Sequence, residues 1–163
     1  MTTACSNRYQ LRGQRVEYLT DMQIFNSVEA ILKPLGLDTP LFPDKIENLF
    51  DLWAEQFGLT IDIVEDDEWP SCTNGHYDPS TLTIRIPTRI LKLIKSKNAK
   101  QRKKGLRVLF HELGHFCLAH KAVLHDSYGN DCKEVDSEEQ ADLFSDYMAV
   151  CIDNLRSKQG VLF

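Results

Sequence analysis

The chain has 163 residues, of which 42% are hydrophobic and 26% are charged, and its formal net charge is −5. This composition is typical of a globular protein and excludes a disordered, collagen-like or coiled-coil chain. No apolar run approaches the roughly 18 residues that a membrane span needs, and the polar start of the chain lacks a signal-peptide core. We therefore expect a cytoplasmic protein without a membrane partner.

The cysteines and the charges give two further indications. The 5 cysteines are widely spaced and form no CxxC pair, which indicates free thiols in a reducing compartment rather than disulfides or a cysteine zinc knuckle. All charged residues in 89–107 are basic, whereas the charged residues in 126–153 are acidic apart from one lysine. The basic block lacks the aromatic residues of a single-strand binder, so we expect a solvated face or a surface for an acidic partner, and no nucleic acid.

The N-terminal part of the chain contains the first predicted helix. Residues 1–19 show no periodicity and are expected to form a flexible N-terminal arm, followed by a single domain over residues 20–163. Thr20 and Gln23 have the spacing of a capping box, and apolar residues then recur at helical spacing until Pro34.

The next segments predict a helix followed by two strands. A second capping box at Asp44 and Glu47 opens a helix that ends at Gly58. Apolar and polar residues then alternate at 59–63 and at 82–86, which predicts two strands. The turn-rich segment between them favours a hairpin-like meander.

Three helices are predicted in the C-terminal half. They cover residues 88–97, 100–121 and 137–155. The second has a broad apolar stripe, and the third starts at a capping box of Ser137 and Gln140.

The helix predicted at 100–121 contains the sequence HELGH, an HExxH motif. His111 and His115 lie one turn apart on the same helix face, so their imidazoles can converge on one zinc ion with Glu112 beside it as catalytic base. The alternative is a pair of surface histidines without a metal.

A zinc site of this type needs a third protein ligand. Leu118 and Lys121 stand where the extended metzincin motif has glycine and histidine, so that arrangement is excluded. Glu138 is the better candidate, because it shares a helix face with apolar residues and a zinc ion would offset its buried charge. The alternative for Glu138 is a favourable interaction with the helix N-terminus only.

Two further residues are weaker candidates for the site. Asp142 lies one turn after Glu138 and can accept the outward N–H of His111, although a solvated aspartate is an equal alternative. Tyr77 is the first choice for a donor to the developing oxyanion, ahead of three other loop residues, His76, His125 and Tyr128. The strand at 81–86 is expected to offer an edge to an extended peptide.

The motifs HELGHFCLAH, TLTIRI, NGHYD and EEQADLF, with an ExxAxxF pattern in the last, resemble the ImmA/IrrE family of zinc metallopeptidases over about residues 44–150. The resemblance implies zinc ligation by His111, His115 and Glu138 with Glu112 as the base. It also implies a small α+β, gluzincin-type zincin fold, in which a short antiparallel or mixed sheet packs on the HExxH helix and on a helix that bears the glutamate.

The expected function is therefore that of a zinc-dependent intracellular metallopeptidase. The resemblance implies a protein substrate of the helix-turn-helix repressor class. The alternative is a catalytically silent, zinc-stabilised module that binds a repressor or antitoxin. Retention of Glu112 favours the enzyme, because a purely structural site needs no general base.

Overall fold

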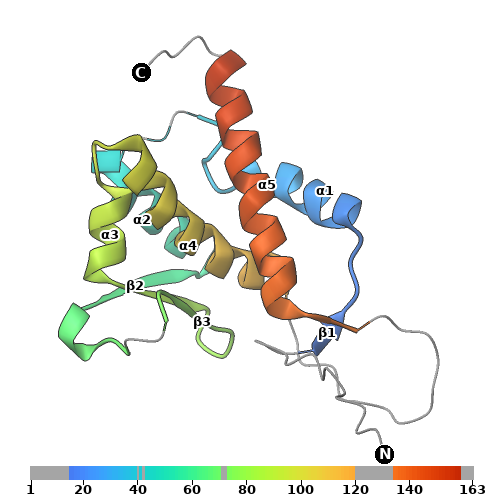
Figure 1. Ribbon diagram of the computed structural model, residues 1–163, viewed down its shortest axis with the longest axis horizontal. Coiled ribbons are helices and arrows are strands. Elements are labelled where there is room, and N and C mark those ends of the chain that lie inside the picture. The colour runs from blue at the N-terminus through green and yellow to red at the C-terminus, as the bar shows by residue number, and fades with distance from the viewer. Residues whose placement is uncertain (1–14, 40, 42, 71–72, 120–133, 159–163) are drawn as a thin grey trace, which may run out of the picture.

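The structure, a computed structural model, describes residues 15–39, 41, 43–70, 73–119 and 134–158. These residues form an α+β fold (Figure 1), as expected. The helices are α1 (Asp21–Leu32), α2 (Ile46–Phe57), α3 (Thr88–Ile94), α4 (Ala99–Cys117) and α5 (Ser137–Lys158). The strands are β1 (Arg15–Glu17), β2 (Thr60–Val64), β3 (His76–Asp78), β4 (Thr83–Pro87) and β5 (Glu134–Asp136), and short 3₁₀ turns lie at Pro43–Lys45 and Asp66–Glu68.

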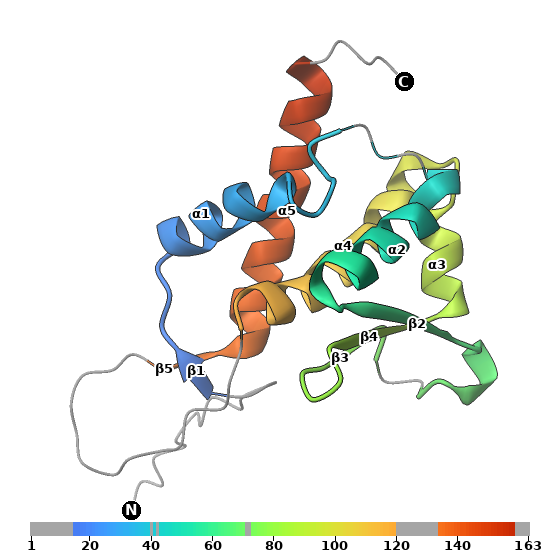
Figure 2. The same ribbon diagram turned by 180° about the vertical axis from the view of Figure 1, so that it is seen from behind.

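Helix α4 runs through the middle of the molecule (Figures 1 and 2). On one side it meets α5, which is covered in turn by α1, and on the other side lie the sheet, α2 and α3. The central position follows from the broad apolar stripe of α4, which includes the fully buried Leu109 and Leu113. The indole of Trp53 in α2 is also fully buried and donates to the carbonyl of Leu35 at 2.8 Å.

The larger sheet is mixed and has the strand order β2-β4-β3. Strands β2 and β4 pair in parallel, with Asp62 opposite Arg85, and β3 pairs antiparallel with β4. The expectation of a hairpin-like meander is therefore wrong for β2 and β4. The turn-rich segment between them does not reverse the chain directly, because it makes a 3₁₀ turn and then contributes β3.

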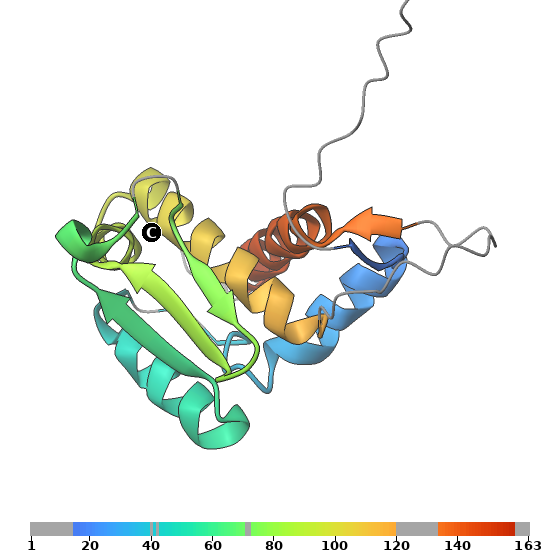
Figure 3. The same cartoon turned by 90° about the horizontal axis from the view of Figure 1, so that it is seen from below.

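The smaller sheet joins the start of the described chain to the strand that leads into α5, beside α1 and α5 (Figure 3). Strand β1 pairs antiparallel with β5, so that Val16 lies opposite Val135. The Val16 side chain is 3% exposed. Residues 15–17 of the segment expected to be a flexible arm (1–19) thus form a strand, whereas residues 1–14 lie outside the described residues.

Two predicted helix ends are confirmed. The Thr20 hydroxyl accepts the backbone N–H of Gln23 at 3.1 Å, and the Gln23 side chain accepts the Thr20 N–H at 2.8 Å, which completes the capping box. Gly58 ends α2 in the left-handed conformation, with φ of 66°, where a side chain would be strained.

Two other helix ends differ from the expectation. Asp44 lies in a 3₁₀ turn, and α2 begins at Ile46 with no capping side chain, so the second capping box is wrong. Helix α4 ends at Cys117 rather than at Lys121, because Ala119 adopts a positive φ of 49° that interrupts the helix. None of the described helices is both long and apolar enough to cross a bilayer.

Candidate metal centre

The structure brings together three side chains from two helices. His111 and His115 lie one turn apart on α4, and Glu138 lies in the first turn of α5. Their potential ligand atoms all lie within 4.8 Å of one another. His111 Nε2 is 2.8 Å from Glu138 Oε2, His115 Nε2 is 3.3 Å from Glu138 Oε1, and the two Nε2 atoms are 3.3 Å apart.

These separations fit a tetrahedral zinc ion. Ligand atoms bound at about 2.0–2.1 Å in tetrahedral geometry are about 3.3–3.4 Å apart, and the two histidine Nε2 atoms have this separation. The Glu138 carboxylate faces both nitrogens, with Oε2 toward His111 and Oε1 toward His115. Two imidazole nitrogens and one carboxylate oxygen are also a donor set of catalytic zinc sites, and they leave the fourth position free for water. The residues present therefore fit a zinc ion.

Asp142 orients the first of the two histidines. Its Oδ1 lies 2.8 Å from His111 Nδ1, so the carboxylate can accept the N–H of that nitrogen. A neutral ring with its proton on Nδ1 presents the Nε2 lone pair to the other ligands. The structure thus places Asp142 against His111, as the predicted hydrogen bond requires, rather than on a solvated helix face.

The charges at the cluster shift two pKa values. Burial lowers the pKa of His111, but the hydrogen bond to Glu138 and the nearby carboxylates outweigh burial and raise it above its ordinary value. Hydrogen bonds from His111 and His115 hold the pKa of Glu138 well below its usual range.

Glu112 is buried beside the three potential ligands. Its side chain is 7% exposed and lines a cavity of about 290 Å³ that also includes His111 and Glu138. Burial raises the pKa of Glu112 above its usual range, while a hydrogen bond from the Tyr77 backbone opposes this effect. A buried carboxylate in this position can accept a proton from a water molecule held in the cavity.

One wall of the cavity is the segment Thr73, Asn74 and Gly75. The Thr73 carbonyl accepts the indole N–H of Trp69 at 2.7 Å and a guanidinium N–H of Arg89 at 3.1 Å, and these bonds fix the wall. A Cβ atom at Gly75 would lie 2.8 Å from Glu112 Oε1, so a side chain there would force the carboxylate or the wall to shift. The sequence marked this segment only as a turn.

The first turn of α5 is held by residues whose role the sequence did not reveal. The Asp136 carboxylate accepts the N–H of Glu138 at 3.0 Å and so caps the helix. The side-chain amide of Gln140 donates to the carbonyl of Glu17 in β1 at 2.8 Å. The sequence signal for this cap was Asp136, an aspartate directly before the apolar helical pattern. Ser137, which follows it, was the other possible capping residue.

Helices α4 and α5 approach closely at Gly114. A Cβ atom there would lie 3.1 Å from the Cα of Ala141 and 3.2 Å from the Cβ of Phe144. Further along, the buried Ser145 hydroxyl donates to the carbonyl of Arg107 at 3.0 Å. These contacts set the separation of the helix that bears the two histidines and the helix that bears Glu138.

Of the predicted oxyanion donors, the two that the structure describes, Tyr77 and His76, do not line the cavity. The Tyr77 ring packs edge-on against Phe116, with centroids 6.1 Å apart, and Tyr77 is absent from the described residues that line the cavity. Its contribution to Glu112 comes from the backbone. His76 lies on β3, whereas His125 and Tyr128 lie outside the described residues.

The expectation that the strand at 81–86 offers a free edge is wrong. Strand β4 lies between β2 and β3, so both of its sides are paired. The periodicity of a strand does not reveal how many partners it has. The sheet edge nearest to α4 is β3, which contacts this helix and follows the Gly75 wall in the chain.

Comparison with known proteins adds little to this geometry. No protein-family model matches the chain, and no curated protein matches it. A transcriptional regulator of Mycobacterium tuberculosis with a solved structure is 18% identical, with a TM-score of 0.38, over 86% of this chain and 44% of that chain. The chain thus spans less than half of the length of that regulator.

Proposed function

We propose that the chain is a zinc-dependent metallopeptidase of the HExxH…E type that hydrolyses a peptide bond in a protein substrate. The observation that carries this proposal is the convergence of His111, His115 and Glu138, with the buried Glu112 beside them. The resemblance of HELGH and the downstream ExxAxxF to the ImmA/IrrE family supports the same assignment.

The reaction adds one water molecule across the C–N bond of a peptide. A bound zinc ion would supply Lewis-acid activation of this water and of the substrate carbonyl. Glu112 takes one proton from the water and delivers it to the nitrogen of the leaving amine, while the carbonyl carbon gains the oxygen. Asp142 keeps the His111 N–H on Nδ1, so the Nε2 lone pair stays directed at the cation.

The substrate is proposed to bind in an extended conformation along β3. The β3 side away from β4 has no strand partner among the described residues. A peptide added at this edge would gain main-chain hydrogen bonds, and it would pass the Gly75 wall beside Glu112. The family resemblance makes a helix-turn-helix repressor the substrate class to test first.

The metal assignment is tested by the zinc content of the purified protein. We expect about one zinc per chain, lost on His111→Ala or His115→Ala and strongly reduced by Glu138→Ala. Glu139→Ala is the matched control, because Glu139 is exposed on the same turn and is outside the cluster. Zinc retained in both histidine variants, or equal losses from the two glutamate variants, would contradict the site.

The catalytic assignment is tested by Glu112→Gln, which keeps the shape of the side chain and removes the base. The variant should keep zinc and fold but lose cleavage by roughly 10²–10⁴-fold. Wild type and Glu112→Gln are each co-expressed with a helix-turn-helix regulator encoded nearby, and proteolytic fragments are detected by mass spectrometry. If both bind the regulator with zinc present and neither cleaves it, a zinc-stabilised binding module is the better explanation for that partner.

A further inference from the structure

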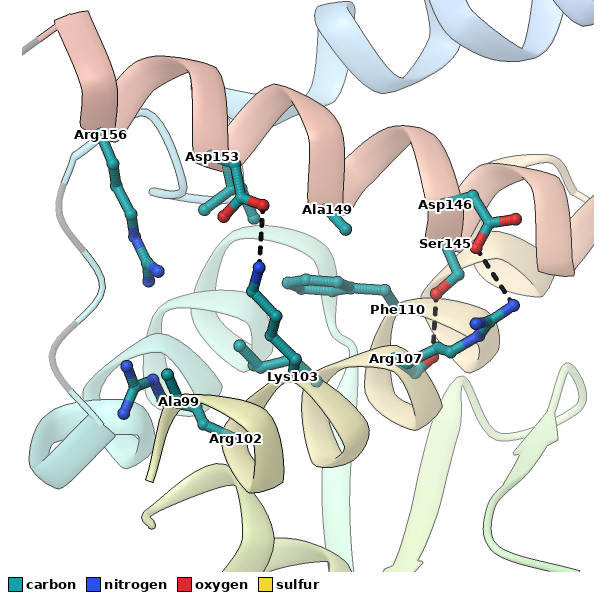
Figure 4. A pocket seen from close by; sticks show the side chains of 12 residues that line it. Ala99, Arg102, Lys103, Arg107, Phe110, Ser145, Asp146, Ala149, Asp153 and Arg156 are labelled. Carbon is teal, nitrogen blue, oxygen red and sulfur yellow. Dashed lines mark hydrogen bonds and ion pairs between the residues drawn. The ribbon is translucent and has the colours of Figure 1, made fainter. Parts of the chain in front are cut away.

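A second cavity lies between α4 and α5, away from Glu112 and the three potential ligands (Figure 4). Its volume is about 240 Å³. It runs from Ala99 to Phe110 along α4 and from Ser145 to Arg156 along α5. We call it the interhelical cleft, and its lining residues are Ala99, Arg102, Lys103, Leu106, Arg107, Phe110, Ser145, Asp146, Ala149, Ile152, Asp153 and Arg156.

The floor of the cleft is apolar. Leu106 and Phe110 from α4 and Ile152 from α5 line it, and each belongs to the main hydrophobic core. Ala149 faces them with only a methyl group, so the small side chain leaves the space open. The volume exceeds the about 150 Å³ of a cavity that binds benzene, so the cleft can hold a ring or a short alkyl chain.

The rim of the cleft carries an excess of positive charge. Lys103 pairs with Asp153 at 3.3 Å and Arg107 pairs with Asp146 at 3.1 Å, so these four charges compensate one another. The two remaining charged side chains are both arginines, Arg102 and Arg156.

These two arginines lie at the same end of the cleft. Figure 4 shows them reaching from opposite helices into the space between α4 and α5. Among the described residues, Arg102 donates to the backbone carbonyls of Ser96 and Lys97, at 2.9 and 3.4 Å, and to no carboxylate. Within the described part of the chain, Arg156 has no hydrogen bond or ion pair. Two guanidinium groups that converge without a carboxylate between them fit an anion.

We propose that the interhelical cleft binds a small amphiphilic anion, with its apolar part on the floor of the cleft and its carboxylate between Arg102 and Arg156. The N-terminal end of α4 at Ala99 adds a favourable dipole at the arginine end. The two arginines favour an anion, and the volume admits a ring or a short alkyl chain. The floor offers no hydrogen bond, so the body of the ligand should be apolar. The site does not depend on the proposed hydrolase.

Binding of octanoate to the full chain tests this site, with calorimetric titration as the measurement. Octanoate should bind saturably, and both 1-octanol, which lacks the charge, and acetate, which lacks the chain, should bind at least tenfold more weakly. Arg156→Gln should weaken octanoate binding about tenfold. Lys158→Gln, which removes a charge from the same turn of α5 but outside the cleft, should leave it unchanged.

A second variant closes the cleft from the exposed side of α5. Ala149→Phe should abolish octanoate binding and keep the circular dichroism spectrum, because position 149 is exposed. No saturable octanoate binding, equal binding of octanol, or equal effects of Arg156→Gln and Lys158→Gln would overturn the proposal. The proposal would also be overturned if the chain bound an acidic peptide but not octanoate. A dimer detected by sedimentation and dissociated by Ala149→Phe would overturn it as well.

Discussion

His111 is held through both of its ring nitrogens. Nδ1 faces Asp142 and Nε2 faces Glu138, each at 2.8 Å, so the ring cannot rotate without losing a charged hydrogen bond. The ring orientation is therefore fixed by α5, although the residue belongs to α4. A ligand whose orientation is set in advance loses less conformational freedom when a metal binds.

Asp142→Ala should weaken zinc binding by about 10–100-fold, because His111 loses the group that fixes its tautomer and orientation. The measurement is competition for zinc with a chromophoric chelator. Asp146→Ala is the control, since it removes an aspartate one turn later that pairs with Arg107 instead. Equal affinities for the two variants would show that Asp142 does not act on the metal site.

Gly75→Ala should lower the proposed peptidase activity while the zinc content is retained. The added methyl would lie 2.8 Å from Glu112 Oε1 and 3.0 Å from its Cγ, so the carboxylate or the wall must shift. Gly58→Ala is the control, because its Cβ meets nothing within 4 Å and its cost of about 1–2 kcal/mol arises from the positive φ alone. Activity and thermal unfolding are measured for both. Unchanged activity in Gly75→Ala would show that the wall does not affect catalysis.

Among the elements, the start of α5 is the best-supported part of the centre. Strand β5 leads directly into α5 and pairs with β1, and Gln140 returns from the helix to the β1 carbonyl of Glu17. The position of Glu138 therefore depends on a strand at the opposite end of the described chain.

Truncations on either side of β1 test this dependence. Removal of residues 1–17 eliminates β1 and the Gln140 contact and should weaken zinc binding, because Glu138 loses its fixed position. Removal of residues 1–14 keeps β1 and should leave the zinc affinity unchanged. Affinities are compared by chelator competition on folded protein. If the longer truncation binds zinc like the full chain, the small sheet does not position the ligand.

The helical elements of the site could be predicted from the sequence, because a helix has a period of its own. The i, i+4 spacing of His111 and His115 needs only the geometry of α4, and Glu138 was found from the apolar face of α5. Partnerships between distant segments have no such local pattern. The parallel pairing of β2 with β4, the short strands β1 and β3, and the approach of Gly75 to Glu112 therefore escaped prediction.

At the scale of the whole molecule, one hydrophobic core extends from α1 to α5. It includes residues far from the potential metal ligands, such as Trp53, Leu59 and Ile94, which are fully buried. The basic and acidic blocks of the sequence meet across α4 and α5 through the Lys103 and Arg107 ion pairs. These pairs are exposed, so each contributes at most about 1 kcal/mol, and the core determines stability.

Removal of the metal should lower stability without unfolding the protein, because the core does not pass through the cluster. Zinc at about 1,000 times its dissociation constant would stabilise the fold by about 4 kcal/mol. Chelator treatment should therefore lower the midpoint of thermal unfolding and leave the far-ultraviolet circular dichroism unchanged at 25 °C. A chelator-treated chain without helical signal would identify the zinc as a structural ion instead.

The pairing of β1 with β5 also affects how the chain can be divided. Residues 15–119 supply α4 with both histidines, residues 134–158 supply α5 with Glu138 and Asp142, and the two pieces interlock through the small sheet and the Gly114 crossing. The described contacts of Glu138 with His111, with His115 and with Asp136 lie within these two pieces. A split form made of two separately expressed halves would thus retain these described contacts, and a zinc ion held by the three potential ligands would join the halves by coordination across the break.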